Sequence, residues 1–555
     1  MKSFFKTLLL LIIKYQLSII NCFSQQAPGI EWAKCYGGSY WDAAYAVIQT
    51  HEGGYMVVGE TASDDYDVSG NHDSSDFWAV KLDSFGNIQW QKCYGGSDAD
   101  AAFSVIETNT GSFVISGLTL SNDSDVSGNH GLSDYWIIKT DSSGNLLSQN
   151  CLGGSAKESF NSNIGGLSQV FRDNQLIQCT DGGIAMIGST LSNDGDVSGN
   201  HGNEDYWVVK LDSALNVQWQ KCLGGSGFDF GCSIIQAADG GYAVAGWSES
   251  NDGDVTGHHG PLSEPDYWVA KLDSTGNLQW QKSLGGTDRD FGLSIINSAN
   301  GGFVVCGFVN SNDSDVTGNH NPIGFTTEDT WIVMLDSTGN LQWQKCFGGT
   351  QSEWGPKILK TFDGNMAAVS TTYSNNGDVS GNHGEYDYWI IKIDSAQNIL
   401  FQKCLGGPWF DYVFSFSQTA DSGFVLAGWV MSNGADVTGY HDSICWGEWC
   451  PDFWVVKLGP DTLTGIINHK SSINHLQIFP NPSNGIFQIT FPQNQKTNCT
   501  LDVINTLGQT VFAAQPETKN QKPETQLDLS FLPKGIYVLK ISDGKEAANK
   551  ILIIE

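Results

Sequence analysis

The chain alternates apolar and polar positions in one pattern that recurs through most of its length. Each unit opens on a Gly-Gly pair and contains four apolar-rich runs, which in the second unit are AAFSVIET, SFVISGLTL, DYWIIKTD and NLLSQN. A period of two, with enrichment in β-branched and aromatic residues, predicts that each run is a β-strand. The D-S-x-G-N phrase after the third run is typical of a hairpin turn. The first glycines of the pairs are Gly37, Gly95, Gly153, Gly224, Gly285, Gly348 and Gly406.

Seven units of four strands predict an all-β, seven-bladed β-propeller over residues 25–459, with one sheet per blade. The last unit ends at DFWVVKLGPDT without a fourth strand, whereas the N-terminal sequence GIEWAKCYGG is a fourth strand without a unit of its own. We therefore expect the N-terminal strand to complete the last blade and close the ring, which removes exposed sheet edges. An open β-solenoid is the alternative, but it gives no reason for splitting the repeat. The tryptophan of each Asp-aromatic-Trp phrase is expected to pack between blades.

The N-terminal residues have the composition of an export signal. Lys2 and Lys6 precede an apolar run, and small or polar residues follow near Ser24, so residues 1–24 are predicted to be a signal peptide. A membrane anchor is the alternative, but Lys14 interrupts the run before it reaches about 20 apolar residues. A lipid-modified Cys22 is a further alternative. We expect the mature chain to lack a transmembrane segment and to be exported through the periplasm.

The C-terminal residues change in character. After a predicted linker at 460–474, residues 475–555 contain short β-rich runs separated by turns, which predict a small β-sandwich. The phrases Phe479-Pro480-Asn481-Pro482 and Leu532–Tyr537, with Lys550–Ile553 near the terminus, resemble the type A C-terminal sorting domain of the type IX (Por) secretion system. The resemblance implies that the type IX machinery is a partner. It also implies a protein that is secreted or held at the outer-membrane surface.

Charge narrows the choice of partners. The chain has 555 residues and a formal net charge of −32, and residues 471–555 carry seven lysines and seven acidic residues, so the excess acid lies in the repeats. Phosphate binding needs clustered cations, which excludes nucleic acid or an anionic membrane as the main partner.

The segment between the second and third strands of each repeat is the most polar. In NDSDVSGNH, counted from Asp123, oxygen-bearing side chains stand at positions 1, 3 and 5, glycine at 6 and Asp134 at 12, which resembles a calcium-binding loop. A loop rich in Asx turns, with carboxylates bonded to their own backbone, is the alternative. The predicted calcium ligands are Asp65, Asp67, Ser69 and Asp76 in blade one; Asp123, Asp125, Ser127 and Asp134 in blade two; Asp194, Asp196, Ser198 and Asp205 in blade three; and Asn376, Asp378, Ser380 and Asp387 in blade six. Blades four, five and seven depart from this spacing.

Three further residue types recur. An acid follows every Gly-Gly pair (Asp42, Asp100, Glu158, Asp229, Asp290, Glu353 and Asp411), and we expect it to lie at one mouth of the channel. Pairing with the lysine of the third strand is favoured over binding a cationic ligand, since buried charges rarely persist unpaired. A histidine ends every polar loop, and loop hydrogen bonding is favoured over zinc. Six repeats share a cysteine that is expected to be a small buried residue, and Cys445 and Cys450 are candidates for a disulfide.

No catalytic signature is present in the sequence: it has no Gly-x-Ser-x-Gly, His-Glu-x-x-His or phosphate loop. The near-uniform blades predict a non-enzymatic binding or adhesion scaffold for a glycan or a protein, with no catalytic or cofactor-binding residues assigned. An extracellular hydrolase or lyase acting on polysaccharide is the alternative, with Asp229 or Glu353 as candidate carboxylates. The insertion at 155–178 and the long loops at 258–266, 320–329 and 440–451 are the candidates for ligand specificity.

Overall fold

The computed structural model describes residues 27–158, 175–320, 327–441, 444–445, 448–461, 477–479, 483–490, 500–504, 510–514, 524–542 and 547–554. The predicted signal peptide and most of the predicted linker lie outside the described residues. The chain divides into two compact units, of which the larger spans Gln26–Thr462 and the other contains the C-terminal residues from Leu463. The described residues contain no helix that is long and apolar enough to cross a bilayer.

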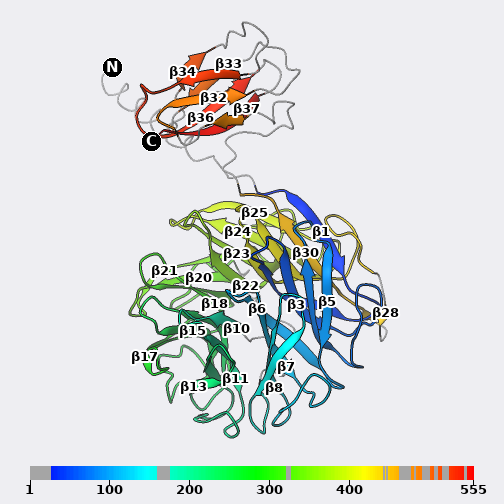
Figure 1. Ribbon diagram of the computed structural model, residues 1–555. Helices are drawn as coiled ribbons and strands as arrows, with labels where there is room; N and C mark the ends of the chain where they lie inside the picture. Colours follow the sequence, from blue (N-terminus) through cyan, green and yellow to red (C-terminus); the bar gives the residue numbers. More distant parts are fainter. Residues whose placement is uncertain are drawn as a thin grey trace, which may run out of the picture. The chain divides into compact units, whose positions relative to one another are not determined.

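The described residues of the larger unit form seven four-stranded antiparallel sheets (Figure 1). The first strands are β2 (Asp42–Gln49), β6 (Asp100–Glu107), β10 (Gln175–Gln178), β14 (Asp229–Gln236), β18 (Asp290–Asn297), β22 (Glu353–Lys360) and β26 (Asp411–Gln418). The second strands are β3 (Tyr55–Thr61), β7 (Phe113–Thr119), β11 (Ile184–Thr190), β15 (Tyr242–Ser248), β19 (Phe303–Val309), β23 (Met366–Thr372) and β27 (Phe424–Val430).

The third and fourth strands complete each sheet on its outer side. The third strands are β4 (Asp76–Leu82), β8 (Asp134–Thr140), β12 (Asp205–Leu211), β16 (Asp266–Leu272), β20 (Asp329–Leu335), β24 (Asp387–Ile393) and β30 (Asp452–Leu458). The fourth strands are β5 (Ile88–Tyr94), β9 (Leu146–Leu152), β13 (Val217–Leu223), β17 (Leu278–Leu284), β21 (Leu341–Phe347), β25 (Ile399–Leu405) and β1 (Ile30–Tyr36). A small hairpin of β28 (Ile444–Cys445) and β29 (Glu448–Trp449) precedes β30.

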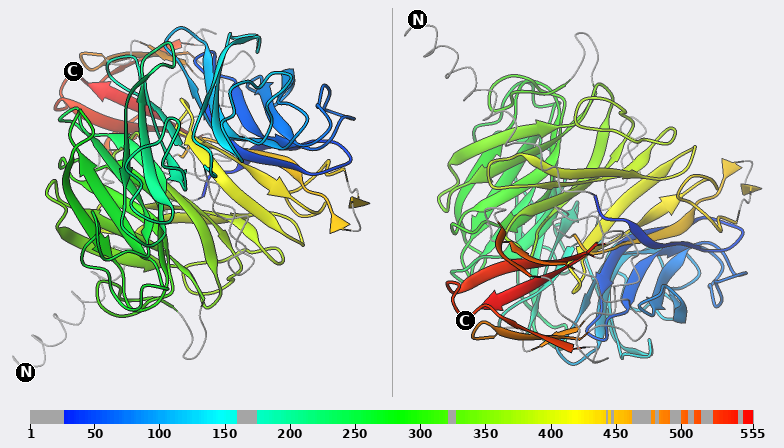
Figure 2. Two further views of the ribbon diagram at one scale, coloured as in Figure 1. Left: turned by 90° about the horizontal axis from the view of Figure 1, so that it is seen from below. Right: turned by 90° about the horizontal axis from the view of Figure 1, so that it is seen from above.

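The N-terminal strand belongs to the sheet that contains the last three strands of the unit. β1 pairs antiparallel with β30, with Cys35 opposite Trp454, and the strand order is β1-β30-β27-β26. In Figure 2, right, β1 (blue) lies alongside the yellow and orange strands of this sheet. Each first strand from β2 to β26 contacts the next one along the chain, and β26 also contacts β2. The sheets are thus arranged around a common axis.

The main core lies between neighbouring blades. The third-strand tryptophans are almost fully buried, and six of the seven pack against an aromatic residue of the preceding blade, as Trp136 does against Phe77 at 4.7 Å; Trp389 shares a core with Ile332 of that blade instead. Six of their ring nitrogens donate to a fourth-strand glutamine of the same blade, as Trp136 Nε1 does to Gln149 Oε1 at 2.8 Å, whereas Trp454 Nε1 is buried without a partner. The prediction that these tryptophans pack between blades is confirmed. Large aromatic surfaces buried in this way contribute strongly to stability.

A glycine in the second strand accommodates a β-bulge in the first. In blade two the register of β6 shifts between Ala102 and Ser104, and a Cβ atom on the facing Gly117 would lie 1.9 Å from the Ala101 carbonyl oxygen. Blade six has Ser370 at the corresponding position of β23. There the irregularity in the first strand widens and extends from Trp354 to Lys357. The serine therefore accompanies a local break in the symmetry of the repeats.

The C-terminal unit is a separate small β-domain. Its strands are β31 (Gln477–Phe479), β32 (Ile486–Thr490), β33 (Thr500–Ile504), β34 (Thr510–Ala514), β35 (Glu524–Asp528), β36 (Gly535–Ser542) and β37 (Ala547–Ile554). They form two sheets, of order β31-β32-β35 and β34-β33-β36-β37. Phe487 and Ile489 of one sheet share a core with Leu501, Val503 and Leu539 of the other. The predicted all-β class is confirmed for both units.

The glycine opposite each bulge generates a stability prediction. Gly307→Ala places a Cβ atom 1.9 Å from the Phe291 carbonyl oxygen, so we expect overpacking to lower the free energy of unfolding by about 3 kcal/mol. Gly29→Ala is the matched control, because no atom lies within 4 Å of its added Cβ. Denaturant unfolding of both variants provides the measurement. Equal stability of the two variants would contradict the proposed role of the bulge.

Candidate functional site

Each blade boundary buries two carboxyl groups against the first glycine of the Gly-Gly pair. At Gly95, Asp76 Oδ1 and Asp100 Oδ2 lie 2.5 and 2.6 Å from the point where a Cβ atom would stand. Both aspartates are at most 1% exposed, so only glycine fits between them. The seven pairs are Asp76–Asp100, Asp134–Glu158, Asp205–Asp229, Asp266–Asp290, Asp329–Glu353, Asp387–Asp411 and Asp452–Asp42. We call them the interface carboxyl pairs.

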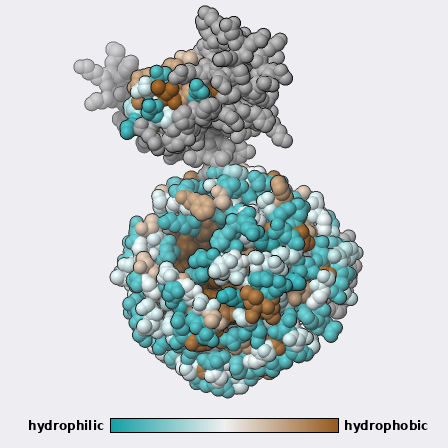
Figure 3. All heavy atoms as spheres, viewed as in Figure 1, coloured by the Kyte–Doolittle hydropathy of each residue, from teal (hydrophilic) through white to brown (hydrophobic). Residues whose placement is uncertain are grey.

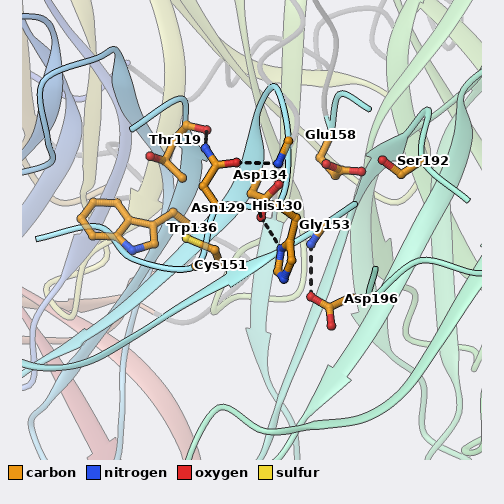
Figure 4. A network of polar contacts seen from close by, with 12 residues as sticks. Thr119, Asn129, His130, Asp134, Trp136, Cys151, Gly153, Glu158, Ser192 and Asp196 are labelled. Carbon is orange, nitrogen blue, oxygen red and sulfur yellow. Dashed lines mark hydrogen bonds and ion pairs between the residues drawn. The ribbon is translucent and has the colours of Figure 1, made fainter. Parts of the chain in front are cut away.

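The two members of a pair have different partners. The first-strand acid accepts hydrogen bonds from the backbone and a hydroxyl group: Asp100 Oδ2 accepts from Gly96 N at 2.8 Å and from Ser121 Oγ at 2.9 Å. The third-strand acid accepts from the loop histidine, as Asp134 Oδ2 does from His130 N at 3.0 Å, with His130 Nδ1 at 2.7 Å (Figure 4). The same histidine contact occurs in all seven blades. The predicted role of the histidines in loop hydrogen bonding is confirmed.

The predicted pairing of the first-strand acids with the third-strand lysines is wrong. These lysines lie near the other end of the sheet, and five of the six contact an acid in the turn between the first and second strands, as Lys271 does Asp239 at 2.7 Å; Lys139 Nζ donates to the Ser213 carbonyl oxygen instead. The acids are also buried between blades, so they do not form the expected ring at the channel mouth. Sequence spacing identified both sets of charges but could not place them at opposite ends of one sheet.

Burial raises the pKa values of the interface carboxyl pairs. Desolvation raises the pKa of Asp76 and of Asp100 to about 6 and that of Asp290 and of Glu353 to about 8, and the partner carboxyl adds to the shifts of Asp76, Asp290 and Glu353. In every third-strand acid, Oδ1 is buried without a hydrogen-bond partner. The interfaces that contain Asp290 and Glu353 therefore favour retention of a proton near neutral pH.

The predicted calcium ligands are directed to different partners. In blade two, Asp123 Oδ1 accepts from Ser97 N at 2.8 Å, Ser127 Oγ accepts from Gln149 Nε2 at 2.7 Å, and Asp134 faces its histidine. Asp196, at position 3 in blade three, accepts from Gly153 N at 3.3 Å (Figure 4). In blades one and six, Asp65 and Asn376 accept a hydrogen bond from the backbone N–H of the residue after the Gly-Gly pair. Ser69 and Ser380 accept a hydrogen bond from a fourth-strand glutamine.

No common centre joins these loop oxygens. Within the described ranges, no three His, Cys, Asp or Glu side chains form a group that could hold a metal ion. Local hydrogen bonds of the alternative loop type are present, since Gly128 N donates to Asn122 Oδ1 at 3.1 Å and Gly70 N to Asp64 Oδ1 at 2.9 Å. A calcium ion would have to replace the existing partners of these oxygens.

The cysteines of the repeats are structural. The six equivalent cysteines are free thiols, five of them buried, and burial raises the pKa of Cys151 and of Cys222 to about 12, which makes these two thiols unreactive. Cys450, outside the repeat positions, is disulfide-bonded. A bridge between Cys450 and Cys445 stays a prediction.

A group of aromatic rings that sequence analysis missed crosses blades six, seven and one. Trp354 stacks on Tyr386 at 5.1 Å, Tyr386 contacts Tyr412 at 5.3 Å, Tyr412 stacks on Trp429 at 4.5 Å, and Trp429 contacts Trp41 at 6.1 Å. The group lies at the end of the sheets that carries the polar loops. We call it the aromatic surface, which consists of Trp41, Trp354, Tyr373, Tyr386, Phe410, Tyr412 and Trp429.

The rings of the aromatic surface are held in place and partly exposed, except Trp429, which is buried beneath its neighbours. Trp354 Nε1 donates to Glu328 Oε2 at 2.9 Å, and Trp41 Nε1 donates to Glu60 Oε1 at 3.0 Å, which fixes the two indole planes. Tyr373 is 38% exposed. These positions differ between blades, so the only sequence signal was a departure from the repeat: Trp354 and Tyr412 stand where blades one and two have alanine.

A central channel opens beside the aromatic surface. It has a volume of about 340 Å³ and is lined by residues of the first strands. Tyr45, Phe103 and Phe414 line it and also pack with Trp41 and other residues of the aromatic surface. Figure 3 shows hydrophobic side chains gathered around the middle of the viewed face, near β6 and β22. Channel and aromatic surface thus form one continuous candidate binding region.

Comparison with known proteins finds a family that the C-terminal residues match. Residues 477–555 match the family described as the secretion system C-terminal sorting domain. The fold and this domain together define a β-propeller protein that the type IX secretion system exports to the cell surface or the extracellular space. The resemblance found in the sequence is therefore confirmed.

Other known proteins are similar to parts of this chain. A segment of 123 residues is 32% identical to the regulatory protein FlaEY of Caulobacter vibrioides and covers 22% of this chain and 12% of that protein. A protein of unknown function from Dyadobacter fermentans is similar at 10% identity with a TM-score of 0.40, covering 78% of this chain and 99% of that one. The Pan2 WD40 domain of Neurospora crassa is similar at 10% identity with a TM-score of 0.41, covering 78% and 96%.

The interface carboxyl pairs generate a pH prediction. Asp290 has its pKa raised from 3.8 to about 8, so between these values the folded chain holds a proton that the unfolded chain releases. The free energy of unfolding therefore falls as pH rises from about 4 to about 8. We expect Asp290→Asn, which cannot ionise, to reduce the fall in melting temperature between pH 5 and pH 8.5 by about 2–4 °C. The exposed Asp288→Asn is the control, and parallel curves for the two variants would contradict the assignment.

Calcium binding stays a prediction for the polar loops. Its signature is a rise in melting temperature at millimolar calcium that magnesium does not reproduce and that Asp123→Asn reduces, because the ion would bind only the folded loop. Thermal melting of the mature chain with calcium, with magnesium and with a chelator measures this effect. An unchanged midpoint would remove calcium from the loops.

Proposed function

We propose that this exported β-propeller is a non-enzymatic scaffold that binds polysaccharide at the cell surface or outside the cell. The observation that carries the proposal is the aromatic surface, in which five ring systems in mutual contact cross three blades. Contiguous apolar surface on a soluble protein marks a binding site, and rigid Trp and Tyr rings are the side chains that most often anchor ligands. Flat rings of this kind stack on the C–H faces of sugar rings.

The polar groups beside the rings suit a glycan better than a second apolar partner. The half-buried carboxylate of Glu328, already oriented by the Trp354 N–H group, stands at the ring edge and offers acceptor oxygens to sugar hydroxyl groups. A net charge of −32 disfavours an anionic polymer on the outer face, so the proposed ligand there is a neutral polysaccharide.

The hydrolase alternative loses the two carboxylates that the sequence suggested for it. Asp229 and Glu353 are fully buried, and each is bonded to the backbone of its Gly-Gly pair, at 2.7 Å from Gly225 N and 3.0 Å from Gly349 N respectively. Neither can reach a glycosidic bond without opening a blade interface. Enzymatic action on polysaccharide would need other carboxylates, of which Glu328 and Glu60 lie beside the aromatic rings.

Truncation of the aromatic surface tests the proposal. We expect the double variant W354A/Y386A to bind neutral polysaccharides at least tenfold more weakly than the unmodified mature protein, because two stacking planes are lost together. The measurement is a glycan array followed by titration calorimetry on the best neutral ligand.

The control variant also loses an aromatic ring, but at the other end of blade six. Phe362 is 67% exposed in the turn between β22 and β23, so Phe362→Ala is expected to leave binding unchanged. Melting curves of both variants show whether they are folded. Equal binding by both variants would refute the aromatic surface as the site. Release of reducing ends from the same panel would replace the scaffold with the hydrolase alternative.

A further inference from the structure

One residue from each first strand contributes to a belt around the channel. Each of these residues follows the bulge of its first strand or, in blade three, has the equivalent partner in the second strand. That partner is the residue just before the second-strand glycine, which is Ser370 in blade six. All seven line the channel. The belt consists of Ala46, Ser104, Gln175, Ser233, Ser294, Lys357 and Ser415.

Three of the four belt serines use their oxygen as an acceptor and keep their proton available, whereas Ser233 Oγ donates to Gln175 Oε1 at 2.8 Å. Ser104 Oγ accepts from Leu176 N at 3.1 Å, which links blade two to blade three. Ser415 Oγ accepts from Val47 N at 3.1 Å, and Ser294 Oγ is 3.3 Å from Ile358 N. Since each hydroxyl group carries one donor besides its acceptor lone pairs, these three O–H groups can donate to a ligand in the channel.

Lys357 is the one charged residue among the described residues that line the channel. No Asp, Glu, Arg or His is in that lining. The Nζ atom of Lys357 has one contact, a 3.4 Å approach to the Leu293 carbonyl oxygen, whereas Lys210, Lys271 and Lys457 each have a carboxylate within 3.3 Å. An ammonium group in a partly buried cavity is costly without a counter-charge.

Lys357 also lies where the repeat symmetry breaks. Blade six alone has the Gly355–Pro356 irregularity before the belt residue, and Gly355 has a φ of 62°, which favours glycine. The widened bulge places Lys357 at a position that is serine, glutamine or alanine in the other blades. A unique cation at one point of a ring of hydroxyl donors is an asymmetric, anion-selective arrangement.

We propose that the channel belt binds the carboxylate of a small sugar acid, with the Lys357 ammonium as its counter-charge and the belt serines as hydrogen-bond donors. A volume of about 340 Å³ is at the lower end of the range for small-molecule pockets and fits a ligand of one or two sugar rings. Tyr45, Phe103 and Phe414 at one side of the belt supply apolar contact for the ring itself. The belt adjoins the aromatic surface but shares no residue with it, so this proposal does not depend on the function proposed for the aromatic surface.

The test compares a uronate with its neutral parent sugar on the mature protein. We expect galacturonate to bind, and galactose to bind at least tenfold more weakly, in ligand-observed NMR and calorimetry. Lys357→Met is expected to weaken galacturonate binding at least tenfold, and added salt to weaken it in the unmodified protein. Lys360→Met is the matched control, because this exposed lysine lies on the same strand outside the channel lining.

Several results would overturn the proposal. They are equal binding of galactose and galacturonate, equal effects of the two lysine substitutions, and no binding of galacturonate by the unmodified protein. Acetate and phosphate are tested as competitors of galacturonate. Displacement of galacturonate by acetate supports a carboxylate site, and tighter binding of phosphate than of either carboxylate contradicts a carboxylate site. The variant W354A/Y386A distinguishes the two sites, since it should retain galacturonate binding whether or not the polysaccharide proposal holds.

Discussion

Only a hydrogen atom fits at the first glycine of each Gly-Gly pair, and the blade interfaces follow from that constraint. Carboxyl oxygens of two adjacent blades approach within 2.8 Å of the point where a side chain would begin, as at Gly37 and Gly95. The next amide then reaches the first-strand acid, and the loop histidine holds the acid of the preceding blade. Other hydrogen bonds cross the boundary, such as that from Leu176 N to Ser104 Oγ, so a blade does not satisfy all of its buried polar groups alone. The ring is therefore a condition for the stability of each unit.

The charges of the repeat are separated along the sheet. One end buries carboxyl pairs that are stabilised by amide, hydroxyl and imidazole groups and retain protons because burial opposes ionisation. The other end places third-strand lysines against acids that are largely exposed, as in Lys210 and Asp181. This separation explains how an acidic chain packs its blades closely. The raised pKa values of Asp290 and Glu353 reduce the negative charge expected in their interfaces near neutral pH.

The candidate binding residues lie where the sequence departs from the repeat. The identical positions are occupied by packing and hydrogen bonding, which leaves them unsuited to recognising an asymmetric ligand. Trp354, Tyr412 and Lys357 replace smaller or neutral residues of the other blades, and they lie around one channel and its mouth. The near-uniform blades thus form a rigid frame, and a few local departures from the repeat form a specific surface on it.

Local patterns determined much of this protein. Period-two alternation, hairpin turns and the split repeat are properties of short segments, so the strands, the four-stranded units and the place of the N-terminal strand could be predicted from the sequence by itself. The histidine contacts and the tryptophan packing were also predictable, because repetition showed that each needed a local partner. Only the tertiary structure decided which acid meets which partner, why the loop oxygens of Asp123 and Ser127 do not converge, and that rings from three blades touch. Those contacts join residues that are distant along the chain, and their distances depend on how each sheet twists and packs against the next.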